Sequence, residues 1–219
     1  MLKIYGANLS SPSNKVRFVA NALGLKYEYI QVKLREGEQR KPEFLKLNPA
    51  GKIPVIVDGD FVLSESGAII KYLCDKNKSS YYPSDLKRRA IVDQWIDYSI
   101  IHVGAAMVRV VFNRLFAPII KTEVDESSLK CGLEFLSRYL PILDAQLGKG
   151  KFLAENTLTL ADFTLLSTLD PAEAADIDVS SHKNVAAWRK KLKAEDFYQK
   201  CHASFEEVFQ KTMGAAQAR

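Results

Sequence analysis

The sequence predicts two domains of different class, an α/β domain over residues 1–77 and an all-helical domain over residues 86–219. Up to residue 77, short alternating apolar segments are interleaved with segments of helical period, in the order β-α-β, connector, β-β-α. Beyond residue 85 only the helical period remains. Between them, residues 78–85 are rich in Ser and Tyr and contain a Pro, which predicts a linker.

The first unit reads as strand, helix and strand. Residues 2–5 form a short apolar strand, and Ser11-Pro12 look like a helix cap followed by proline at the first helical position. Apolar residues then recur at helical spacing and Gly24 follows where a helix would end. Residues 27–34 alternate between polar and apolar, which predicts the second strand. The buried helical positions would be Val16, Val19, Ala20 and Leu23.

The second unit reads as two strands and a helix. Residues 43–47 have a short helical pattern, and Asp58-Gly59 is a hairpin signal between the apolar runs 55–57 and 61–63. Ser64 can cap a helix whose buried stripe contains Ile69, Ile70 and Leu73. A mixed four-stranded sheet covered by helices is the compact solution for this order of elements.

The remainder of the chain predicts a helical bundle. Apolar-periodic runs occupy residues 86–120, 124–147, 160–170, 183–193 and 195–211. Thr159 and Asp162 have the spacing at which a threonine caps a helix and an acid in the first turn returns the bond.

Composition and charge exclude several classes. There is no membrane-spanning pattern and no signal peptide, so we expect a cytoplasmic protein. Residues 1–77 hold 12 Lys and Arg against 8 Asp and Glu, which suits a small anionic ligand but also scattered solvated lysines; we expect no nucleic acid. The Cys and His residues have no metal-ligand spacing, so we expect no metal. They are Cys74, Cys131, Cys201, His102, His182 and His202.

Four spaced motifs together resemble the soluble glutathione transferases, in particular their serine-type theta, delta and phi groups. Residues 48–55 read NPAGKIPV and residues 63–69 read LSESGAI, similar to the glutathione-site signature of that family. Residues 158–163 (LTLADF) and 184–188 (NVAAW) resemble its helical-domain motifs. The resemblance implies a thioredoxin-like first domain, glutathione as co-substrate, no tightly bound cofactor, and a homodimer.

The resemblance also implies a set of glutathione contacts. The Ile53–Pro54 bond would be cis, so that the backbone of Ile53 pairs with the peptide ligand like an added strand. Ser66, at a helix start, would bind the γ-glutamyl carboxylate, and Glu65 would accept from the ligand's ammonium group. Lys52 and Arg40 would contact the glycine carboxylate. Without the glutathione-site signature before it, a Ser-Glu pair at a helix start would be interpreted as an ordinary helix cap.

A hydroxyl near the first helix would activate the glutathione thiol, because a free thiol has a pKa of about 8.5 and is largely protonated at neutral pH. Aligned with the serine-type pattern, Ser10 is the catalytic residue and Ser11 caps the helix, although Ser11 and Ser13 stay open as alternatives. With no cysteine at Ser10 or Ser13, we expect conjugation or peroxide reduction rather than thiol exchange.

The resemblance places a hydrophobic electrophile against the helix around residues 103–116. An apolar cleft there would accept such a substrate, although apolar residues at helical spacing are more often core. A glutathione-transferase-like module that binds without turnover is the alternative to an enzyme. The candidate contacts are Met107, Val111, Phe112, Leu115 and Phe116.

Overall fold

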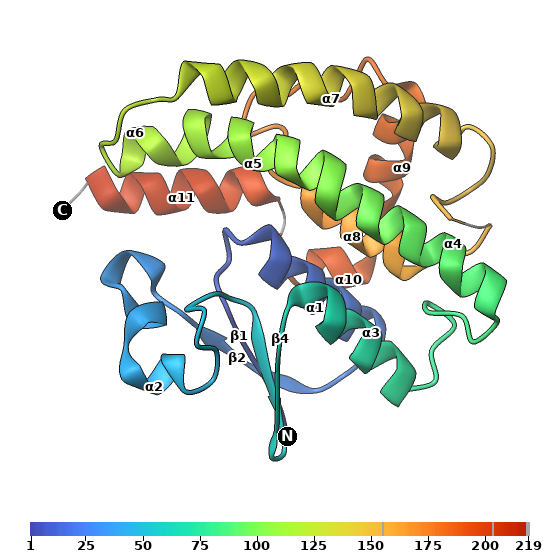
Figure 1. Ribbon diagram of the computed structural model, residues 1–219, viewed down its shortest axis with the longest axis horizontal. Helices are drawn as coiled ribbons and strands as arrows, with labels where there is room; N and C mark the ends of the chain where they lie inside the picture. Colours follow the sequence, from blue (N-terminus) through green and yellow to red (C-terminus); the bar gives the residue numbers. More distant parts are fainter. Residues whose placement is uncertain (155, 203, 218–219) are drawn as a thin grey trace.

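The computed structural model in Figure 1 describes residues 1–154, 156–202 and 204–217. An α/β domain forms the lower part of the view, and the helices of the second domain lie above it. This arrangement agrees with the two classes of structure that the sequence predicts.

A mixed four-stranded sheet forms the first domain, as expected. The strands are ordered β2-β1-β3-β4, with β1 parallel to β2, antiparallel to β3, and β3 antiparallel to β4. The central strand β1 places Ile4 beside Tyr29 and Ile56. The strands are β1 (Leu2–Gly6), β2 (Tyr27–Gln31), β3 (Val55–Asp58) and β4 (Phe61–Ser64).

The two faces of the sheet are covered differently. Because side chains alternate along a strand, Ile4 and Ile56 join the main core, while Tyr5 and Val55 belong to a second, smaller cluster. Phe44 of α2 completes that small cluster, which Ile53 also contacts. The segments joining the strands are α1 (Ser11–Ala22), η1 (Leu34–Glu36), η2 (Glu38–Arg40), α2 (Pro42–Leu45) and α3 (Ser66–Lys76).

The second domain is helical throughout its described part. Its first helical run is continuous but contains two π-helical turns, η3 and η4, which the sequence pattern did not predict. The single helix expected over residues 195–211 is wrong, because it is divided into two helices. The elements are α4 (Leu86–Asp97), η3 (Tyr98–Gly104), α5 (Ala105–Val111), η4 (Phe112–Phe116), α6 (Ala117–Ile119), α7 (Glu126–Leu147), α8 (Leu160–Leu169), α9 (Lys183–Lys193), α10 (Asp196–Gln199) and α11 (Phe205–Gln217).

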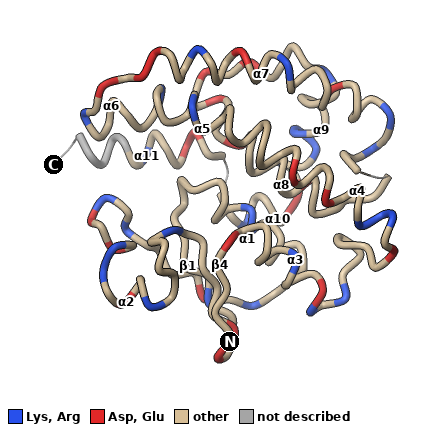
Figure 2. The backbone as a smooth tube through the Cα atoms, in the orientation of Figure 1, with Lys and Arg blue, Asp and Glu red and all other residues tan. Residues whose placement is uncertain are grey.

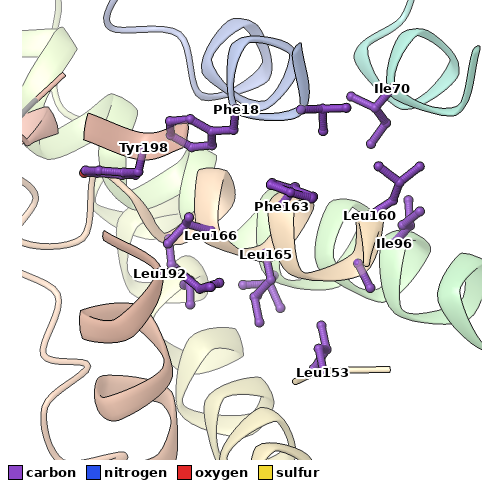
Figure 3. Packing of buried hydrophobic residues seen from close by; sticks show 14 of the residues in the cluster. Phe18, Ile70, Ile96, Leu153, Leu160, Phe163, Leu165, Leu166, Leu192 and Tyr198 are labelled. Carbon is purple, nitrogen blue, oxygen red and sulfur yellow. The ribbon is translucent and has the colours of Figure 1, made fainter. Parts of the chain in front are cut away.

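Helix α8 is the buried centre of the molecule and joins the two domains. It packs against both α1 and α4. In Figure 3, Leu160 and Phe163 of α8 point toward Phe18 of α1 and Ile70 of α3, and Leu165 points away from them. A helix that is apolar on all sides requires such partners around it. The shared core fixes the start of α1 relative to the helical domain.

The run Leu86–Ile119 is long and apolar enough to cross a membrane by length and composition alone. Within the structure, 44% of its most apolar window is buried. Its segments pack against α7 and α8, which is how a core helix of a bundle satisfies the same test.

The capping box predicted at the start of α8 is confirmed. Thr159 caps α8, and the fully buried Asp162 returns the bond. Asp162 also accepts from Leu153 N–H at 2.9 Å and from Trp188 Nε1–H at 3.0 Å. The same carboxyl therefore joins three segments of the helical domain.

Candidate active site

The turn between β1 and α1 presents three serines. Ser10 has an extended backbone (φ −106°, ψ 105°), and its Oγ accepts from Ser13 N–H at 3.3 Å, so Ser10 is the N-cap of α1. The expectation that Ser11 caps the helix is wrong by one residue, because Ser11 already lies in the helix and Pro12 follows it there.

The hydrogen bonds of these serines distinguish their roles. Ser13 is fully buried, and its Oγ donates to Ser10 Oγ at 3.0 Å and accepts from Ala7 N–H at 3.4 Å. Ser10 Oγ therefore accepts two bonds, and its own proton remains available for a ligand. Ser11 is half-buried. Ser10 and Ser11 can face a ligand, whereas the hydroxyl of Ser13 is enclosed by the protein.

The loop before β3 is fixed from inside. The Ile53–Pro54 bond is cis, as predicted. The buried Asn48 donates through Nδ2 to Lys52 O at 2.8 Å and accepts at Oδ1 from Ala50 N–H at 3.1 Å. Within the described ranges, the peptide N–H and C=O of Ile53 make no backbone hydrogen bond. They are available to pair with an extended peptide.

The junction of β4 and α3 has an unusual backbone. Glu65 has φ 67° and ψ 106°, a left-handed conformation that is uncommon for a residue with a side chain. Glu65 occupies the N-cap position of α3, so the predicted Ser64 cap is wrong. The exposed Glu65 side chain makes no capping hydrogen bond either. Ser66 begins the helix and is half-buried. The N–H groups at this end suit an anionic ligand.

Lys52 and Arg40 lie on neighbouring segments, and both are exposed. The link between them is Gly51 (φ +62°), where an added Cβ would lie 3.0 Å from the carbonyl oxygen of Gln39. The loop therefore packs against the end of η2. Figure 2 shows Lys and Arg along the segments around α2, where a carboxylate would find positive charge.

A cleft of about 510 Å³, here called the α5 cleft, lies between the starts of α1 and α3 and the helical domain. Of the candidate substrate contacts, Met107 and Val111 line it. Sequence reasoning missed Lys15 on its wall, because no pattern distinguishes this lysine from a solvated one. The lining residues used below are Ser11, Lys15, Ser66, Met107, Val108 and Val111.

A second cleft of about 500 Å³, the α6 cleft, lies between the turn after β1, the segment 33–36 and the helical domain. Phe116 lines it, whereas Leu115 is buried at 6% exposure and Phe112 is 42% exposed, and neither lines either cleft. Ser10 itself lines neither cleft, but its chain neighbours do, because Leu9 lines the α6 cleft and Ser11 the α5 cleft. The apolar lining of the α6 cleft includes Leu9, Leu34, Phe116, Ile119 and Ile120.

Comparison with known protein families shows which family has this sequence and fold. The family model for the glutathione S-transferase N-terminal domain matches residues 1–75, and the model for the C-terminal domain matches residues 105–196. The chain belongs to the glutathione S-transferase family. The two matches fall on the α/β domain and the helical domain, respectively.

Individual glutathione S-transferases resemble the chain over almost its whole length. Glutathione S-transferase F10 of Arabidopsis thaliana is 32% identical over 212 residues, which cover 94% of this chain and 98% of the relative. The delta-class structure from Nilaparvata lugens has a TM-score of 0.86 at 31% identity, covering 98% of this chain and 99% of that one. The human theta-class structure, in complex with the glutathione conjugate of 1-menaphthyl sulfate, has a TM-score of 0.89 at 28% identity, covering 98% and 91%.

These similarities confirm the family that the motifs indicated, and the fold is that of a glutathione S-transferase. The candidate glutathione contacts Ser10, Ile53 and Glu65 lie in the α/β domain, after β1, before β3 and after β4, respectively. Among the described residues no three His, Cys, Asp or Glu side chains are grouped as a metal site would require.

Proposed function

We propose that the protein is an enzyme that holds glutathione as a thiolate and transfers it to hydrophobic electrophiles. The observation that carries this proposal is the Ser10 hydroxyl at the N-terminus of α1, whose proton is available to donate and whose chain neighbours line the two clefts. A hydrogen bond from Ser10 and the positive end of the helix dipole both stabilise a sulfur anion. The thiol of bound glutathione is thereby ionised near neutral pH.

Glutathione would lie extended across the ends of the strands. Its cysteinyl backbone pairs with Ile53, and its γ-glutamyl group meets Ser66 and Glu65 at the start of α3. Its glycine carboxylate points toward Lys52 and Arg40. The order of these residues along the ligand leaves the cysteine sulfur beside Ser10.

The electrophile would then enter the α6 cleft, whose lining begins at Leu9, next to Ser10. Phe116, Ile119 and Ile120 make this cleft apolar on the helical-domain side. With an aryl halide, the thiolate sulfur forms a bond to the ring carbon and the halide leaves with its electron pair. The thiol proton has already passed to solvent.

The test is turnover of purified protein with glutathione and chlorodinitrobenzene, with cumene hydroperoxide in a parallel assay. We expect conjugate formation that saturates with glutathione. Glutathione binding by calorimetry without turnover of either compound would instead favour the non-catalytic binding module.

Glu65→Ala and Ser66→Ala should each weaken glutathione binding by about 1.5–3 kcal/mol, because each removes a hydrogen bond to a charged group of the ligand. Calorimetry measures this directly. Asp60→Ala, an exposed acid in the hairpin beyond β3, is the control and should bind normally. Unchanged affinity in both site variants would show that the γ-glutamyl group of glutathione does not bind at the start of α3.

We also propose a cytoplasmic homodimer. Ile101 and Val108 are 61% and 67% exposed on the long helical run, which suits burial against a second subunit. Light scattering at micromolar concentration should therefore give twice the chain mass of 24.6 kDa. A mass equal to one chain would contradict the dimer.

A further inference from the structure

Lys15 is a buried lysine without a partner. Its residue is 4% exposed on α1, and it lines the α5 cleft. Within the part of the chain that the structure describes, its ammonium makes no hydrogen bond and no ion pair. A cation that is largely removed from solvent and open only to the cleft is unfavourable unless an anion compensates it. A ligand that enters the cleft can supply that anion.

In the described ranges of the chain, none of the charged groups around Lys15 forms an ion pair with its ammonium. Burial lowers the pKa of Lys15 to about 8, while the charge of Glu65 acts to raise it and that of Lys71 to lower it. Lys71 is itself paired with Asp93 at 2.8 Å. Arg109 also lines the cleft and is exposed. Glu65 is thus the acid that acts on Lys15, and it makes no direct ion pair with it.

Two further features of the α5 cleft suit a carboxylate. Ser66, at the N-terminus of the 11-residue helix α3, lines the same cleft as Lys15. Apolar side chains of Met107, Val108 and Val111 form much of the remaining wall, which strengthens an interaction between opposite charges.

We propose that Lys15 binds the α-carboxylate of the γ-glutamyl group of glutathione, together with Ser66, an inference that rests on the proposed function. The γ-glutamyl end carries a carboxylate and an ammonium group on one carbon, so its complement is a cation beside an anion. Lys15 and Glu65 are such a pair. The glycine end of glutathione has no ammonium group and does not match it.

The test is calorimetry with S-methylglutathione, whose sulfur does not titrate, and with its analogue in which 4-aminobutyryl replaces γ-glutamyl and the α-carboxylate is absent. Lys15→Met should bind S-methylglutathione about 10- to 100-fold more weakly than wild type and bind the analogue with wild-type affinity. Lys26→Met removes an exposed lysine before β2 and should bind both compounds normally.

A second measurement needs no variant. The pKa of the Lys15 ammonium, followed by NMR of carbon-labelled lysine, should rise by at least about one unit when S-methylglutathione binds, and should not rise with the analogue. This NMR titration of the wild-type protein tests the role of Lys15 even if Lys15→Met fails to fold. Equal affinity in a folded Lys15→Met, or an unmoved pKa, overturns the inference while leaving the enzyme intact. Failure of wild type to bind S-methylglutathione overturns the proposed function instead.

Discussion

Replacing Ser10 with alanine should lower conjugating activity near neutral pH by about 10- to 100-fold. The lost hydrogen bond to the thiolate corresponds to about 1.5–3 kcal/mol, and one pKa unit to about 1.4, so the thiol pKa of bound glutathione should rise by about one to two units. Activity should recover as the pH rises, because the anion then forms without the hydroxyl. The thiolate absorbance of the complex, titrated with pH, measures the shift.

The N-cap role of Ser10 calls for a matched control. Ser10→Ala should also lower the free energy of unfolding by about 0.5–2 kcal/mol through loss of the cap, whereas Ser10→Gly keeps most of the cap's stability and still lacks the hydroxyl. Both variants should lose activity equally. Ser11→Ala should titrate like wild type. It is a cleaner control than Ser13→Ala, because Ser13 is bonded to Ser10.

Two results would contradict this assignment. Identical thiolate titrations in wild type and Ser10→Ala would remove Ser10 from thiol activation. A shift in Ser11→Ala alone would move the role one residue along the chain, to the side that lines the α5 cleft.

Asp162→Ala should lower the free energy of unfolding by about 3–5 kcal/mol. The carboxyl accepts from Leu153 N–H, Thr159 N–H, Thr159 Oγ and Trp188 Nε1–H at 2.9–3.1 Å, so its removal strands several buried donors at once. Burial raises the pKa of Asp162 to about 6, which leaves the group ionised at neutral pH. The expected loss in the free energy of unfolding for Asp162→Ala is therefore larger than the loss expected for an ordinary helix cap.

Urea unfolding followed by circular dichroism measures this change. Asp196→Ala is the control, because the Asp196 side chain is 93% exposed and its loss should change stability by no more than about 0.5 kcal/mol. Equal midpoints for Asp162→Ala and wild type would show that the donors around Asp162 find other partners.

Local sequence patterns, each spanning a few residues, were sufficient to predict most of the secondary structure of this protein. The strands, the hairpin at Asp58-Gly59 and the Thr159 capping box were predictable, because turn residues, alternation and cap spacing act locally. The prediction of the cis bond before Pro54 depended instead on the resemblance to a known family. An isolated Ile-Pro pair carries no such information.

Tertiary structure alone decided which serine caps α1 and which lysine shares a cleft with Ser66. The choice of cap between Ser10 and Ser11 is made by the backbone, which is extended at Ser10 and already helical at Ser11. Lys15 and Ser66 share a cleft although they are far apart in sequence. Their meeting depends on α1 and α3 packing beneath the helical domain, and burial across domains leaves no local pattern in the sequence.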